Sequence, residues 1–239
     1  MLNVGWMTAP AGIWREGEEE PERPLRIPVP AYLVETDTER ILIDTGLHPD
    51  AISDSARRYG EEAPIRHFGL EQEESIADQV DLATVTRVVV TPLHFDHAGG
   101  LDLIPDSIPI VIQRAEWEAG QERAAVERNF LLPRDYAGAA TELILVDGDH
   151  DLLGDGSVEL LSTPGHTPGH QSVRIGDLVL GVDVAYFANS LDDLRLPAFG
   201  DDRDAQRHSA ARVREMRDAG QRFLPGHDPD VLRPGRVAV

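Results

Sequence analysis

The sequence predicts an α/β protein in which two β-sheets pack face to face and helices cover their outer sides. Short apolar and β-branched runs occur in groups along the chain, and the helical segments between them lack the strict alternation of a doubly wound sheet. Of the 239 residues, 41% are apolar, which is enough for a sizeable core. We therefore expect residues 1–239 to form a single domain, since α/β domains often exceed about 200 residues.

The individual elements follow from local patterns of apolar and helix-forming residues. An irregular opening and a charged loop, Glu16–Arg26, precede a hairpin of Ala31–Glu35 and Arg40–Asp44. Apolar runs predict further strands at Arg87–Thr91, Ile108–Ile112, Ser157–Leu161, Gln171–Ile175, Leu178–Val182 and Arg222–Leu224. Helix formers and the spacing of apolar residues predict helices over Glu71–Gln79, Arg114–Arg128 and Asp204–Ala219.

The charge of the chain excludes several classes of partner. The 22 basic residues are all arginine, and 43 acidic residues bring the formal net charge to −21. A nucleic acid or an anionic membrane surface would repel such a protein. No apolar run is long enough to cross a bilayer, and the N-terminus lacks the pattern of a signal peptide. We expect a cytoplasmic protein that binds neither nucleic acid nor membrane.

The strongest chemical signal is a short segment rich in candidate metal ligands. Cysteine is absent, so any metal site must use nitrogen and oxygen ligands. In the segment TPLHFDHAGG at 91–100, His94, Asp96 and His97 follow a predicted buried strand. The two glycines after them give the chain the freedom that an irregular turn needs.

Three more segments deliver a histidine or an aspartate from the end of a predicted strand. His166 lies in the Pro- and Gly-containing loop TPGHTPGHQS at 163–172, Asp183 directly follows the strand Leu178–Val182, and His227 lies in the turn PGHD. Four separate strands thus present metal-binding residue types at their ends, which is how a rigid scaffold builds a metal site.

Together these motifs resemble the metallo-β-lactamase superfamily over nearly the whole chain, from Ala31 to Asp228. The segment VIQRAEWEAG at 111–120 and the spacing from Asp183 to Tyr186 are more narrowly similar to the quorum-quenching N-acyl-homoserine lactone lactonases. The resemblance implies a four-layer αβ/βα sandwich, a site for up to two zinc ions, and a small-molecule lactone as the substrate.

The resemblance also implies a role for each candidate residue. The first metal would be bound by His94 and His166, the second by Asp96, His97 and His227, and Asp183 would bridge the two. Hydroxide would attack the lactone carbonyl, since a bound metal lowers the pKa of its water to near neutrality. Tyr186 would direct its phenol at the carbonyl oxygen, and Asp96 would protonate the departing alkoxide.

One position departs from the family pattern. The family motif begins with a histidine two residues before His94, and here that position is Pro92, which has no side-chain donor atom. The second site keeps a full set of four ligands, whereas the first keeps three, which weakens it. Four other histidines are candidates for a substitute ligand, although each also reads as an ordinary surface or core residue: His48, His67, His150 and His170.

Other interpretations stay open at this stage. The protein could be another hydrolase of the same fold, acting on a different lactone, a thioester or a β-lactam, because fold alone does not decide the substrate. Pro92 also allows a catalytically impaired metal-binding protein. Tyr186 could be a packed rim residue. Met7, Ile13 and Trp14 either line an acyl-chain pocket or pack on the core. A homodimer is a further alternative.

Overall fold

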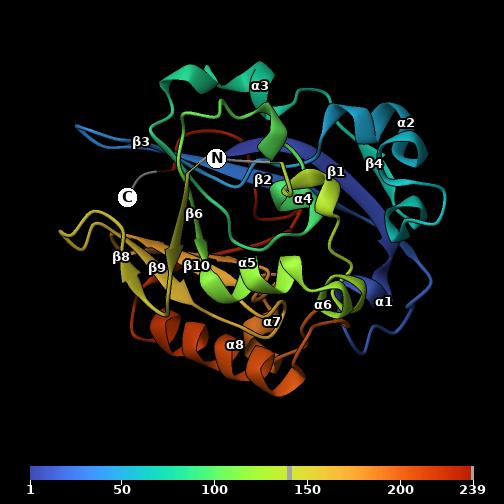
Figure 1. Cartoon of the computed structure of the whole chain (residues 1–239). Helices are drawn as coiled ribbons and strands as arrows, with labels where there is room; N and C mark the ends of the chain where they lie inside the picture. Colours follow the sequence, from blue (N-terminus) through green and yellow to red (C-terminus); the bar gives the residue numbers. More distant parts are fainter. Residues whose placement is uncertain (139–141, 238–239) are drawn as a thin grey trace.

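Two β-sheets stack face to face in the computed structural model, which describes residues 1–138 and 142–237 (Figure 1). The larger sheet has the strand order β4 (Gly69–Glu71), β1 (Leu2–Pro10), β2 (Pro24–Glu35), β3 (Arg40–Ile43), β5 (Arg87–Val89), β6 (Ile110–Gln113) and β7 (Leu143–Val146). The smaller sheet has the order β12 (Arg222–Pro225), β11 (Leu178–Val182), β10 (Gln171–Ile175), β9 (Val158–Ser162) and β8 (His150–Asp151).

Helices connect the strands and lie mainly on the outer sides of the sheets. The α-helices are α1 (Ala11–Trp14), α2 (Pro49–Tyr59), α3 (Ile76–Gln79), α4 (Phe95–Ala98), α5 (Arg114–Gln121), α6 (Arg123–Arg128), α7 (Ser190–Asp193) and α8 (Arg203–Asp218). Single 3₁₀ turns are η1 (Pro64–His67), η2 (Leu82–Thr84), η3 (Leu101–Leu103) and η4 (Pro133–Asp135). Figure 1 shows α8 running along the outside of the smaller sheet.

Side chains alternate between the two faces of each sheet, and this alternation produces a layered core. Ile43 of β3 belongs to the same buried cluster as Leu180 of β11, so this cluster lies between the sheets. Leu42 points to the opposite face, where it shares a cluster with Ile76 of α3. Val179 packs in a third cluster with residues of α8. Three apolar interfaces therefore separate four layers, and the predicted αβ/βα sandwich is confirmed.

Most of the predicted elements are present, but three predictions were wrong. The opening of the chain is not irregular: it forms β1, which pairs with β2 and β4. Only the last four residues of the predicted helix 71–79 are helical, since α3 begins after the capping box of Ser75 and Asp78. The predicted helix 114–128 is interrupted at Glu122, whose backbone is extended.

None of the helices in the described ranges has the length and apolar character that a membrane span requires. Strands β3, β5 and β6 run parallel, so their carboxyl ends reach the same edge of the larger sheet. Strand β11 runs parallel to β12 in the smaller sheet and likewise directs the residues that follow both strands to a common edge. Three predicted ligand segments begin after β5, β11 and β12. The fourth follows β9, which runs in the same direction as β11 because both are antiparallel to β10.

Candidate metal centre

The fold brings the six predicted ligands together from four loops. They form two buried groups, His94, His166 and Asp183 in one, and Asp96, His97 and His227 in the other. Within each group the candidate ligand atoms all lie within 4.8 Å of one another.

The second group has the spacing of a tetrahedral metal site. His97 Nε2 lies 3.4 Å from Asp96 Oδ2, and His227 Nε2 lies 3.6 Å from the same oxygen. Zinc–nitrogen and zinc–oxygen bonds of about 2.0–2.2 Å place two ligand atoms of a tetrahedral site roughly 3.3–3.5 Å apart. The observed distances are close to that value, so a zinc ion fits between these side chains.

The Asp183 carboxylate lies between the two groups. Its Oδ2 atom is 3.0 Å from His166 Nε2 and 3.3 Å from His97 Nε2, and its Oδ1 atom is 2.9 Å from His227 Nε2. Although burial opposes ionisation, His97 and His166 hold the pKa of Asp183 well below its usual range. An ionised carboxylate in this position suits a ligand shared by two metals.

The backbone before Asp183 is held in an uncommon conformation. Val182 has a φ of 51°, in the left-handed region that β-branched residues rarely adopt. The pairing of β11 with β12 is irregular between Leu180 and Val182. His170 Nε2 accepts the Asp183 N–H at 3.1 Å, and burial lowers the pKa of His170 to about 3, so this ring is neutral. These contacts direct the carboxylate toward the metal ligands.

Further contacts orient the histidine rings from behind. His97 Nδ1 lies 2.8 Å from Asp44 Oδ2, and the same carboxylate accepts hydrogen bonds from the backbone and the hydroxyl of Thr91. His227 Nδ1 lies 2.8 Å from the Pro28 carbonyl, and His94 Nε2 lies 2.9 Å from a backbone carbonyl. A partner on one ring nitrogen sets the tautomer and leaves the other nitrogen for the metal.

Sequence reasoning missed Asp44 as a member of this site. From the sequence, Asp44 is placed only at the end of the strand Arg40–Asp44. No sequence motif links it to His97. The one local signal is its place after an apolar strand and before Thr45-Gly46, where the left-handed φ of 60° at Asp44 turns the chain.

Some buried ligand atoms lack hydrogen-bond partners, and this indicates whether the site suits a metal. His97 Nε2 and Asp183 Oδ2 are both buried, and although oppositely charged groups lie 3.0–3.4 Å away, neither atom makes a hydrogen bond of good geometry among the described residues. Unpaired buried polar atoms are costly in a folded protein. Since both atoms face the centre of the cluster, metal coordination would satisfy them, and the residues present fit a bound metal.

None of the four other candidate histidines joins either group of candidate ligands. His170 Nε2 accepts a hydrogen bond from the Asp183 backbone. His48, at the start of α2, has its Nε2 atom 3.0 Å from Asp102 Oδ1. His67 lies on the wall of a cavity, and His150 is exposed on β8. The group that contains His94 therefore has two histidines and the shared Asp183.

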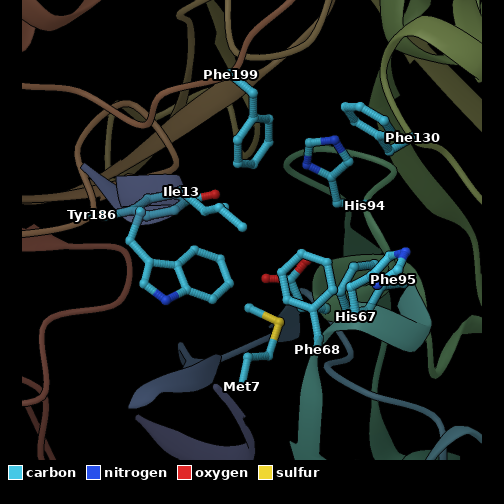
Figure 2. A pocket seen from close by; sticks show the side chains of 11 residues that line it. Met7, Ile13, His67, Phe68, His94, Phe95, Phe130, Tyr186 and Phe199 are labelled. Atoms are coloured by element: carbon cyan, nitrogen blue, oxygen red, sulfur yellow. The ribbon is translucent and has the colours of Figure 1, made fainter. Parts of the chain in front are cut away.

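An apolar cavity of about 370 Å³ opens above the ligands. His94, Asp96 and Tyr186 line one part of it, and Figure 2 shows aromatic and aliphatic side chains around the rest. These side chains are Met7, Ile13, Trp14, Phe68, Phe95, Phe130 and Phe199. Met7 and Trp14 are also part of the buried core, so the predicted packing of these N-terminal residues is observed, and the same residues line the cavity.

Tyr186 lies against the ligand histidines at the edge of this cavity. Its ring centroid is 4.6 Å from that of His227 and 5.9 Å from that of His166. Burial, together with the Asp183 and Asp96 carboxylates, raises the pKa of Tyr186 well above its ordinary value. Its phenol thus stays protonated, and its hydroxyl group hydrogen-bonds the Asp183 carboxylate.

The layered fold and the paired ligand groups define the class of this protein. The model of the metallo-beta-lactamase superfamily matches residues 25–227, and the chain belongs to this superfamily. The superfamily predicted from the sequence is confirmed.

Within the superfamily, the similarity is to N-acyl homoserine lactonases. One from Bacillus cereus is 33% identical over 204 residues, which are 80% of this chain and 77% of that protein. N-acyl homoserine lactonase AttM from Azorhizobium caulinodans is 30% identical over 85% of this chain and 83% of its own length.

A solved structure shows the same likeness. It is an N-acyl homoserine lactone hydrolase with the product N-hexanoyl-L-homoserine bound at its catalytic metal centre. It matches with a TM-score of 0.82 and 25% identity over 96% of this chain and 92% of that chain. The predicted similarity to lactonases is confirmed, and the protein is a metal-dependent hydrolase of this superfamily.

Proposed function

We propose that this protein opens the ring of N-acyl-homoserine lactone-like substrates by hydrolysis. The observation that carries the proposal is a buried cluster of six candidate ligands, of which His94 and Asp96 line an apolar cavity together with the protonated Tyr186. The names of the relatives point to the same substrate class.

Two zinc ions would be held by the two ligand groups. His94, His166 and the shared Asp183 would bind the first, and Asp96, His97, His227 and Asp183 the second. Bound zinc supplies Lewis acidity that activates water and polarises a carbonyl group. Because Pro92 contributes no ligand, we expect the first ion to be held more weakly than the second.

The side chains around the cavity would carry the remaining steps. The Tyr186 phenol donates a hydrogen bond to the carbonyl oxygen as negative charge develops there during attack by water on the carbonyl carbon. Asp96 lines the cavity, and its carboxylate accepts the proton that the water releases. The same group then gives this proton to the ring oxygen as the carbon–oxygen bond breaks, and the product is a hydroxy acid.

The apolar walls suit an acyl chain. Phe68, Phe95 and Ile13 present hydrocarbon surface to the space above the ligands. Burial of a methylene group in such surroundings is worth about 0.8 kcal/mol. Binding the chain there would hold the lactone ring over the metal ligands and exclude water from the cavity.

The test is hydrolysis of N-hexanoyl-homoserine lactone by protein supplied with zinc. We expect ring opening by the parent, none after chelation, and none in Asp183→Ala. Tyr186→Phe should slow turnover by up to about 10²-fold at unchanged zinc content, because it removes one donor to the oxyanion.

Three results would contradict the proposal. Hydrolysis of a thioester but of no lactone would indicate another hydrolase. Zinc binding without any ester hydrolysis would indicate an impaired metal-binding protein. A Tyr186→Phe variant that matches the parent on every lactone would show that the tyrosine is structural.

The cytoplasmic location and the homodimer alternative stay predictions.

A further inference from the structure

Glu116 is a buried carboxylate that contacts both loops of the proposed first metal site, the loop with His94 and the loop with His166. It lies in the first turn of α5 and is 0% exposed. Its Oε1 atom accepts the backbone N–H of Leu93 at 2.8 Å, and its Oε2 atom accepts the backbone N–H of Gly169 at 2.8 Å. Each carboxylate oxygen therefore holds a different loop.

These two backbone groups lie next to the ligands of the first site. Leu93 directly precedes His94, and Gly169 lies three residues after His166. His94 Nδ1 and His166 Nε2 are 3.1 Å apart. A carboxylate that fixes both loops therefore fixes the distance between the two imidazoles.

The packing around Glu116 leaves the loop that carries His166 and Gly169 little freedom to move. A Cβ atom at Gly169 would overlap the backbone of Glu116, so the loop rests directly on the start of α5. At the first loop, Pro92 has no N–H group, and Leu93 offers the first backbone donor before His94. The Glu116 bond to Leu93 thus anchors the backbone directly before His94, while the Asn129 carbonyl contacts the His94 ring itself.

The second site has a separate support. Asp44 contacts His97 Nδ1 at 2.8 Å and accepts the Thr91 N–H at 2.9 Å, and among the described residues its carboxylate bonds neither His94 nor His166. The centre thus contains two buried carboxylates outside the ligand set, one behind each metal site.

We propose that Glu116 is a positioning residue that tunes the affinity of the first metal site, while Asp44 does so for the second. The inference rests on the proposed metal centre and deepens it. A chain that has lost one ligand at the first site depends more on the placement of the two remaining histidines, because two ligands plus a shared carboxylate must then hold the ion.

Glu116→Gln tests the role of Glu116 separately from that of Asp44, because the glutamine side chain has nearly the same size and shape as glutamate. The amide has one acceptor oxygen, so it can satisfy Leu93 or Gly169 but not both, and its NH₂ group would face the other N–H. Loss of such an outer contact typically lowers metal affinity about 10- to 100-fold. We expect that loss in one zinc-binding phase only.

The experiment is a zinc titration of chelator-treated protein by calorimetry, combined with metal content per chain. Glu116→Gln should weaken one phase, and Asp44→Asn should weaken the other. Glu118→Gln, an exposed glutamate of the same helix, is the matched control and should change neither phase. Circular dichroism of the metal-free variants checks that they fold.

A second readout keeps the inference testable if Glu116→Gln folds poorly. Glu116→Asp retains both acceptor oxygens on a shorter side chain, and we expect it to regain part of the lost affinity. Hydrogen exchange of the Leu93 and Gly169 amides in metal-free protein should be faster in Glu116→Gln than in the parent.

The outcomes distinguish this inference from the proposed function. A parent that binds no zinc would overturn the metal centre itself. A parent that binds zinc in two phases, with both weakened equally by Glu116→Gln or the same phase weakened by both variants, would overturn the positioning role alone.

Discussion

At the scale of single residues, the two proposed metal sites differ in the number of candidate ligands that each would have to itself. Asp96, His97 and His227 surround the second position, whereas the first has His94 and His166. Both share Asp183. The resemblance to the family implies a histidine at the position of Pro92, and we propose that its absence leaves the first site one ligand short.

Replacing Pro92 with histidine should raise the metal content. If the three remaining ligands hold the first ion weakly, the parent should carry about one zinc per chain at limiting zinc, and Pro92→His should retain two. Metal analysis after dialysis measures this directly. The variant should also hydrolyse lactones faster at limiting zinc. Two tightly held ions in the parent would contradict the weakened first site.

At the scale of elements, the N-terminal strap (residues 11–23) forms one wall of the cavity. Ile13 and Trp14 line the cavity, and two arginines anchor the strap to residues 193–195 near α7. Arg15 pairs with Asp193 at 2.8 Å, and Arg195 Nε donates to the Glu16 carbonyl at 3.0 Å. The anchors are partly exposed, so each contributes little by itself, but together they hold the wall in place.

Shortening Ile13 should weaken the binding of long acyl chains. Ile13→Ala removes hydrocarbon from the cavity wall, and at about 0.8 kcal/mol per methylene group we expect KM for a decanoyl lactone to rise roughly three- to tenfold. KM for a short-chain lactone should change little. Ile144→Ala, at an exposed site on β7, serves as the control. An equal change for both chain lengths would mean that the strap does not contact the acyl chain.

At the scale of the whole molecule, metal binding and folding are linked. Asp96 and Asp183 are buried together with four candidate ligand histidines, and buried charges without a partner destabilise a folded protein. A metal ion that binds only the folded state neutralises them and adds its binding free energy to stability.

Removing the metal should therefore lower the melting temperature. At a zinc concentration 100-fold above Kd, binding stabilises the folded state by about 2.7 kcal/mol. For a protein of this length that corresponds to roughly 5–11 °C in Tm. Differential scanning calorimetry with zinc and with a chelator measures the difference, and His227→Ala should shrink it. Identical transitions with and without zinc would contradict the linkage.

Much of this protein was predictable from local sequence. The bounds of β10 and β11 follow from short apolar runs, and the six candidate ligands follow from His and Asp placed after strands in loops shaped by Pro and Gly. Such signals are local, because a strand, its end and the turn that follows are encoded within about ten residues.

Only the tertiary structure decided how distant segments meet. The opening residues form β1 because β2 and β4 offer partners there, and their own pattern did not predict a strand. Asp44 reaches His97 and Glu116 reaches Leu93 across 53 and 23 positions of sequence. A buried carboxylate of this kind is stabilised by the hydrogen-bond donors around it. Those donors belong to distant loops, which come together only when the two sheets pack.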